Sequence, residues 1–210
     1  IDMARPGLTE NDLAGETCKV IIAGGSVYFA GTPFVSSGYR TSIGHGTWAG
    51  RRLEKDEPVF FELSANVKRY STCLMRTIHL GQPTDEFRRM ADASIEALDA
   101  AIEAIRPGAT SGQVDEAARS VIDRAGFGKH FPNRVGYSLG IGFPPGWGEG
   151  RVMSLRANDS RVLRKGMTFH LVPGPRIVGR YGCAFSETVL VTKDGCEPLT
   201  KEIPREFIVK

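Results

Sequence analysis

An internal repeat constrains the fold of this chain more than any other feature of its sequence. The run Arg5-Pro-Gly-Leu-Thr9 returns 101 residues later as Arg106-Pro-Gly-Ala-Thr110. In both copies the threonine is placed to cap a helix, because its hydroxyl can accept from exposed backbone N–H groups. Each predicted helix ends at glycine, the first at Gly24-Gly25 and the second at Gly126. Features that recur in the same order predict two similar half-units.

The repeat continues into the segments that follow these helices. Gly38-Tyr39 matches Gly136-Tyr137, and similar charged runs precede the apolar segments 59–61 and 167–169. The offsets drift from 98 to 111, which loop insertions explain. A longer amphipathic helix, capped by Thr84 and ended by Pro107-Gly108, joins the halves. We expect an α+β fold in one domain, 1–210, with half-units 1–83 and 84–210, a curved antiparallel-rich sheet backed by helices, and a pocket between the halves.

Charge and composition exclude several classes of function. The net charge is +3, and no Lys/Arg block indicates a nucleic-acid partner. No apolar stretch approaches the ~20 residues of a membrane helix, and no signal peptide opens the chain, so we expect a cytoplasmic protein with reduced thiols. The four Cys form no C-x-x-C pair and the four His no H-x-x-H pair. The abrupt start at Ile1 leads us to expect a missing upstream N-terminal domain.

A serine-nucleophile motif is present but lies in the wrong context. Gly136 to Gly140 matches G-x-S-x-G, which requires a strand before the serine and a helix after it. The segment 141–146 carries two prolines and two glycines and cannot be that helix. We therefore do not expect a serine hydrolase.

Glu62 and His45 are the candidate acid/base residues. Glu62 ends the run Val59-Phe60-Phe61, where desolvation would raise its pKa. His45 lies in a small-residue loop and can take and return a proton near neutral pH. The alternatives are a strand-end glutamate in water or paired with an arginine, and an ordinary surface histidine.

Other side chains are candidates for binding rather than proton transfer. Aromatic residues in Gly-rich loops could form a cage around a compact cation, or could pack the loops together. His170 lies in a predicted strand and could be a satisfied buried histidine, and Glu187 precedes another strand. The aromatic set is Tyr39, Trp48, Tyr137, Phe143 and Trp147.

At these residues the sequence resembles the creatinase/prolidase/methionine aminopeptidase superfamily, which has the pita-bread fold. The resemblance covers nearly the whole chain. It implies a duplicated α+β unit, a separate N-terminal domain in many members, and a homodimer. The motifs that carry it include the segments 37–45, 70–77, 136–140, 163–173 and 187–200.

The same resemblance implies that this chain binds no metal. The metallopeptidases of the superfamily hold two metal ions through two Asp, one His and two Glu. Only the first of these positions keeps a carboxylate, and a further pocket histidine falls on Pro144. The five ligand positions fall on Glu62, Cys73, Tyr137, Val172 and Ser186.

The metal-free branch resembling ectoine/hydroxyectoine hydrolase matches best, through the runs 143–149 and 166–171. It implies metal-independent hydrolysis of a non-peptide C–N bond in a small zwitterion, without a cofactor. The alternatives are a creatinase-like amidinohydrolase, an Xaa-Pro peptidase-like enzyme and a non-catalytic binding domain. Against the first, the assisting glutamate of creatinase falls on Met75. The predicted catalytic residues are Glu62 and His45, and the predicted substrate-binding residues are Trp48, Tyr137, Phe143, Trp147, Arg76, His170 and Glu187.

Overall fold

The computed structural model describes residues 1–210, and its three helices begin after the threonines that the sequence marks. Thr9, Thr84 and Thr110 each accept a hydrogen bond from the backbone N–H three residues on, which satisfies an otherwise free donor of the first turn. None of the helices combines the length and the apolar character needed to cross a membrane. They are α1 (Glu10–Ala23), α2 (Asp85–Ala104) and α3 (Ser111–Arg124).

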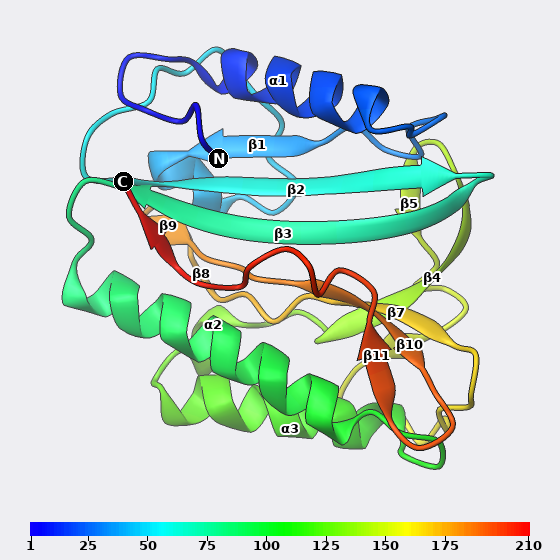
Figure 1. The fold of residues 1–210 in the computed structure, drawn as a ribbon. Coiled ribbons are helices and arrows are strands. Elements are labelled where there is room, and N and C mark those ends of the chain that lie inside the picture. The colour runs from blue at the N-terminus through cyan, green and yellow to red at the C-terminus, as the bar shows by residue number, and fades with distance from the viewer.

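A long sheet forms the centre of the molecule (Figure 1). Its strand order is β1-β2-β3-β4-β7-β10-β11, and all neighbours in that order are antiparallel. β5 and β6 pair with β4, β12 pairs parallel with β3, and β8 and β9 form a separate ribbon. The strands are β1 (Phe34–Ser37), β2 (Glu57–Val67), β3 (Tyr70–Leu80), β4 (Gly136–Phe143), β5 (Gly146–Gly148), β6 (Ser154–Leu155), β7 (Thr168–Leu171), β8 (Arg176–Ile177), β9 (Tyr181–Gly182), β10 (Glu187–Val191), β11 (Cys196–Pro198) and β12 (Ile208–Val209), with 3-10 helices η1 (Gly38–Ser42) and η2 (Gly128–His130).

The repeated sequence makes the same backbone hydrogen bonds in both halves. Gly7 N–H donates to the Leu53 carbonyl at 2.9 Å, and Gly108 N–H donates to the Leu163 carbonyl at 3.0 Å. Both glycines have left-handed φ angles, 93° and 92°, which an L side chain rarely adopts. The two Arg-Pro-Gly runs are therefore structural equivalents, each tying the start of a helix to the chain ahead of a strand.

The glycine-tyrosine match of the two halves is wrong as a structural equivalence. Ser36 pairs with Phe60 in β1–β2, and Tyr137 pairs with His170 in β4–β7. The strands that follow the helices repeat with an offset of 110 residues, which makes Phe60 and His170 equivalent positions. Their pairing partners are then equivalent as well, so Tyr137 corresponds to Ser36 and not to Tyr39. The match of Gly38-Tyr39 to Gly136-Tyr137, with its offset of 98 residues, is therefore a chance match in sequence. The offset of 101 residues that relates the Arg-Pro-Gly runs also relates β1 to β4.

The two faces of the sheet have different roles because successive residues of a strand point to opposite sides. α2 and α3 pack with β6, β7 and β10 in the largest core, and α1 packs with β1, β2 and β3 in a second one, both on one face. The other face carries smaller clusters that contain Phe60, Cys73, Met75, Tyr137 and Trp147. This second face holds the candidate site.

Candidate active site

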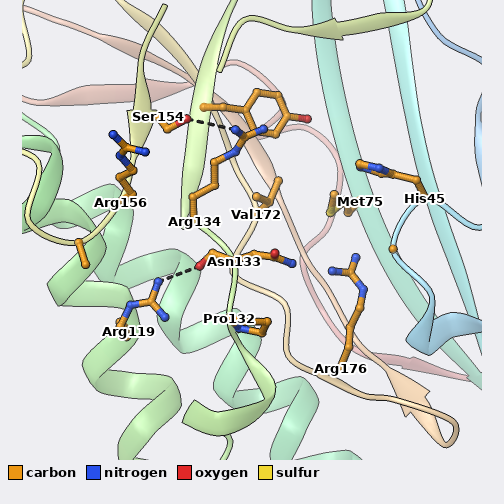
Figure 2. Close-up of a pocket in the computed structure, with 13 residues that line it drawn as sticks. His45, Met75, Arg119, Pro132, Asn133, Arg134, Ser154, Arg156, Val172 and Arg176 are labelled. Carbon is orange, nitrogen blue, oxygen red and sulfur yellow. Dashed lines mark hydrogen bonds between the residues drawn. The ribbon is translucent and has the colours of Figure 1, made fainter. Parts of the chain in front are cut away.

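A cavity of about 870 Å³ opens on the face of the sheet that carries Met75 and Tyr137, and the α3 side chain Arg119 closes one side of it (Figure 2). His45 and Tyr137 line it, as do four arginines, and none of its lining residues is acidic. Its wall is built from segments far apart in the sequence, which local motifs cannot reveal. The lining residues are Gly44, His45, Met75, Arg119, Pro132, Asn133, Arg134, Tyr137, Ser154, Arg156, Ala157, Val172 and Arg176.

Glu62 is buried immediately beside this cavity. Its side chain is 0% exposed, and neither carboxylate oxygen has a hydrogen-bond partner. It lies opposite Phe34 on one neighbouring strand and Met75 on the other, and Met75 lines the cavity. Burial raises the pKa of Glu62 to about 8, partly opposed by the positive charge of Arg176. Glu62 is thus protonated at neutral pH, so the alternative of a solvated or ion-paired glutamate is wrong.

His45 lies at the cavity wall on the loop that follows η1. Its backbone has a φ of 60°, and its imidazole stacks on Phe34 with ring centroids 4.8 Å apart. Burial lowers the pKa of His45, and the charges of Arg176 and Arg134 lower it further. The imidazole is therefore neutral at pH 7 and can accept a proton.

A chain of neutral hydrogen-bonding groups crosses the sheet next to Glu62. The Trp147 indole N–H donates to the Tyr137 hydroxyl at 3.0 Å, and that hydroxyl lies 2.8 Å from His170 Nδ1. His170 Nε2 lies 2.7 Å from the Ser186 hydroxyl, which also accepts from the Met75 backbone N–H. Complete burial lowers the pKa of His170 to about 3, so its ring stays neutral. His170 does not line the cavity and holds the Tyr137 hydroxyl in place instead.

The structure places Arg76 and Glu187 on the opposite face of the sheet from the cavity. They form a buried ion pair at 3.0 Å, and the Arg76 guanidinium also donates to the Pro204 and Ile203 carbonyls. Arg76 is adjacent to Met75 in β3, so its side chain points to the other side. We therefore correct the expectation that these two residues bind substrate.

The predicted aromatic cage does not form. Trp48 packs against the core beneath α1, and Phe143 is 60% exposed with Arg69 over its ring. Trp147 reaches Tyr137, but Arg134 already covers the Tyr137 ring at 4.6 Å. Glu62 is the acidic side chain whose charge acts on the pKa values of both Tyr137 and Arg176.

The five positions where the superfamily binds metal lie together here, but their side chains do not fit a pair of divalent ions. Val172 has no atom that can bind a metal, and the hydroxyls of Tyr137 and Ser186 are both hydrogen-bonded to His170. Burial raises the pKa of the Cys73 thiol well above its usual range. Glu62 is left as the one oxygen donor of the kind that hard metal ions require in numbers. No group of three His, Cys, Asp or Glu side chains is arranged to hold a metal.

Sequence reasoning missed Arg134 and Arg176. Both face the cavity and both act on the pKa of His45. Neither belongs to a motif, since Arg134 precedes β4 and Arg176 lies in the short strand β8. Only the tertiary structure brings them to the same cavity as His45 (Figure 2).

Known proteins resemble this chain along its whole length. It is 35% identical over 219 residues to an ectoine hydrolase of Halomonas elongata, an alignment that covers 100% of this chain and 54% of that protein. It is 33% identical to an uncharacterised hydrolase/peptidase of Sinorhizobium fredii, covering 100% of this chain and 53% of that protein. The chain thus spans about half the length of the curated relatives it matches.

Solved structures share the fold. The Xaa-Pro dipeptidase of Bacillus anthracis superposes with a TM-score of 0.89 at 27% identity, over 100% of this chain and 57% of that one. The prolidase of Pyrococcus furiosus gives 0.87 at 28% identity, over 97% of this chain and 58% of that one. The family model for metallopeptidase family M24 matches residues 1–193, across both halves of the repeat. The chain has the predicted pita-bread fold and belongs to metallopeptidase family M24.

Proposed function

We propose that this chain hydrolyses a C–N bond other than a peptide bond in a compact zwitterion, without a metal ion, and that ectoine is the first substrate to test. The observation that carries the proposal is Glu62, a completely buried carboxyl group without a hydrogen-bond partner, beside a cavity with cationic walls. The 35% identity to an ectoine hydrolase supports the choice of substrate. The proposal also includes the cytoplasmic location expected from the composition and, separately, the homodimer that the superfamily resemblance implies.

A cationic amidinium is the group that suits Glu62. At neutral pH Glu62 keeps its proton because burial raises its pKa to about 8. A positive charge placed next to it favours the ionised form and lowers that pKa, so substrate binding itself generates the reactive carboxylate. A neutral peptide carbonyl lacks this effect.

The reaction adds water across the amidine carbon and breaks one ring C–N bond. Glu62, once ionised, either removes a proton from the attacking water, or attacks that carbon and forms a covalent bond that a water molecule then cleaves, which restores the carboxylate. His45, neutral before the reaction, takes up a proton and delivers it to the leaving ring nitrogen, which yields an amide and an amine. Proton transfer of this kind contributes ~10²–10⁴-fold to the rate. Glu62 reaches the substrate once the flexible side chain of Met75, its neighbour across the β2–β3 pair, turns aside.

The test is turnover of ectoine by protein dialysed against a chelator, with ring opening followed by NMR. Creatine and an Xaa-Pro dipeptide are assayed in parallel, because they represent the creatinase-like and peptidase-like alternatives. We expect ectoine turnover that neither chelator nor added divalent metal changes. Turnover of the dipeptide only after metal addition would establish a peptidase, and binding of ectoine without turnover of any substrate would indicate a binding domain.

Variants assign the two catalytic groups. Glu62→Gln and His45→Ala should each lower kcat by at least ~10²-fold while the protein stays folded. The matched controls are Glu103→Gln, an exposed glutamate on α2, and His130→Ala in η2, outside the cavity lining. Wild-type rates for Glu62→Gln or His45→Ala would remove the role assigned to that residue.

A further inference from the structure

The four arginines that line the cavity are not equivalent. Arg119 is bound to Asp115 by two hydrogen bonds of 2.8 and 3.0 Å. Arg156 lies 3.6 Å from a carboxylate oxygen of Asp159. Arg119 is thus neutralised by an acidic neighbour outside the cavity, and Arg156 is largely exposed beside a carboxylate that Arg161 also binds, whereas Arg134 and Arg176 have no ion pair.

Arg176 makes no side-chain hydrogen bond to the protein, although it is partly buried. Burial lowers its pKa, and Glu62 is the largest opposing influence. Its guanidinium carbon lies 5.9 Å from the centre of the Phe60 ring. A guanidinium removed from water without an acceptor is unfavourable unless an anion completes it.

The position of Arg176 is fixed by the ribbon that carries it. The N–H of Gly179 donates to the Ser42 hydroxyl at 3.1 Å, and the N–H of Gly182 donates to the Thr41 hydroxyl at 3.0 Å. These bonds tie the β8–β9 ribbon to η1, immediately before the loop that carries His45. Arg176 is therefore held near His45 by two independent backbone contacts.

Arg134 offers a second set of free donors. It uses one N–H group, at 3.1 Å from the Ser154 hydroxyl, and its guanidinium lies over the Tyr137 ring. The remaining N–H groups make no hydrogen bond to the protein. Figure 2 shows Arg134 and Arg176 entering the cavity from different walls, with Val172 between them and His45 on the side of Arg176.

We propose that Arg176, with Arg134 as its second contact, is the carboxylate-binding subsite that makes this hydrolase select substrates bearing a carboxylate. The inference rests on the proposed function and names its specificity-determining residues. The guanidinium groups supply paired N–H donors that match the two oxygens of a carboxylate. The substrate is then held by its anion at the arginines, with its cationic end free to approach Glu62.

The decisive experiment measures binding by calorimetry in the Glu62→Gln background, where turnover is blocked. The ligands are ectoine and its primary carboxamide, which keeps the ring and removes the negative charge. We expect the carboxamide to bind ~10–100-fold more weakly than ectoine, the range for hydrogen bonds to charged groups. Arg176→Met should weaken ectoine by a similar factor and leave the carboxamide nearly unchanged, and Arg176→Lys should recover part of the loss.

Arg134→Met should give a smaller loss than Arg176→Met, because Arg134 already donates to Ser154. Arg156→Met is the matched control, since Arg156 also lines the cavity but its side chain is 66% exposed to water, and it should change the ectoine affinity less than ~3-fold. Equal losses for ectoine and carboxamide in Arg176→Met would overturn the subsite, as would unchanged binding.

A second measurement separates this inference from the choice of ectoine. The side-chain N–H signals of protein labelled with 15N-arginine are followed while L-proline or L-prolinamide is added. The signal of Arg176 should move with proline and remain still with prolinamide. If ectoine is neither bound nor hydrolysed but proline still moves the Arg176 signal, the substrate is wrong and the subsite stands. If ectoine is hydrolysed and no carboxylate moves that signal, the subsite is wrong.

Discussion

Replacing Glu62 by glutamine should make the protein more stable, and increasingly so as the pH rises. The unfolded chain ionises this carboxyl at its ordinary pKa of 4.5, whereas the folded protein retains the proton up to about pH 8. Between pH 4.5 and pH 8 the unfolded chain is stabilised by losing this proton, whereas the folded protein keeps the proton and is not stabilised. Stability contributed by protonated Glu62 is therefore complete below pH 4.5 and is lost as the pH rises through 8.

The magnitude follows from the two pKa values. Each pH unit between them costs the wild type about 1.4 kcal/mol of unfolding free energy. Relative to a residue that never ionises, the accumulated loss is ~1 kcal/mol at pH 5, ~3 kcal/mol at pH 7 and ~4 kcal/mol at pH 8. Glutamine has nearly the same shape and no proton to lose, so Glu62→Gln does not undergo this loss.

The assay is urea unfolding at pH 5, 7 and 8 for the wild type and the Glu62→Gln variant. The difference in unfolding free energy between them should move in favour of the variant by ~3 kcal/mol from pH 5 to pH 8. Any change in packing caused by the amide contributes equally at all three pH values. Glu103→Gln, which alters an exposed glutamate of α2, should give a difference that does not vary with pH. If the difference in unfolding free energy for Glu62→Gln stays constant with pH, the raised pKa is refuted. If it moves in favour of the wild type as the pH rises, the pKa of Glu62 is lowered by folding and not raised.

Four further substitutions test the rest of the structure. Glu187→Gln leaves the buried Arg76 without its carboxylate and should cost ~3–5 kcal/mol in urea unfolding, whereas a cost below ~1 kcal/mol would mean that the ion pair is not buried as described. Thr9→Ala and Thr110→Ala remove equivalent capping boxes and should each cost ~1 kcal/mol, so thermal unfolding that responds to only one of them would contradict the equivalence of the halves. Tyr137→Phe removes the hydroxyl at the centre of the hydrogen-bonded series and should lower the free energy of unfolding by ~1–3 kcal/mol. The NMR signal of the Trp147 indole N–H, which donates to this hydroxyl, should shift, and an unchanged signal would contradict that contact.

Local sequence signals were sufficient for the helices, but they left the burial of Glu62 open. Thr9, Thr84 and Thr110 are recognisable as caps because a cap needs only its own helix. Glu62 follows an apolar run, but that run fits both a buried carboxyl group and a strand-end glutamate in water or in an ion pair, and the structure shows that the side chain is completely buried. The same reasoning could not distinguish Arg76 from Arg176, because the two differ in which face of the fold they reach and not in their local setting.

The direction of a side chain from a strand depends on register, and register depends on partner strands far away in the sequence. A shift of one residue moves a side chain to the opposite face. Met75 lines the cavity while its neighbour Arg76 joins the buried pair with Glu187. For the same reason the glycine-tyrosine match of the halves looked equivalent in the sequence, and the pairing of Tyr137 with His170 shows that it is not.

The sequence by itself determined the duplication, the helices, the superfamily and the identity of the residues at the metal positions, because these follow from residue types and their order. The tertiary structure decided which groups share the site. It placed His45, Arg134 and Arg176 around one cavity beside the buried Glu62, and it moved Arg76, Glu187, Trp48 and Phe143 away from it. The physical reason is that chemistry at a site depends on distances across the sheet and on exclusion of water, and both are set by long-range strand pairing.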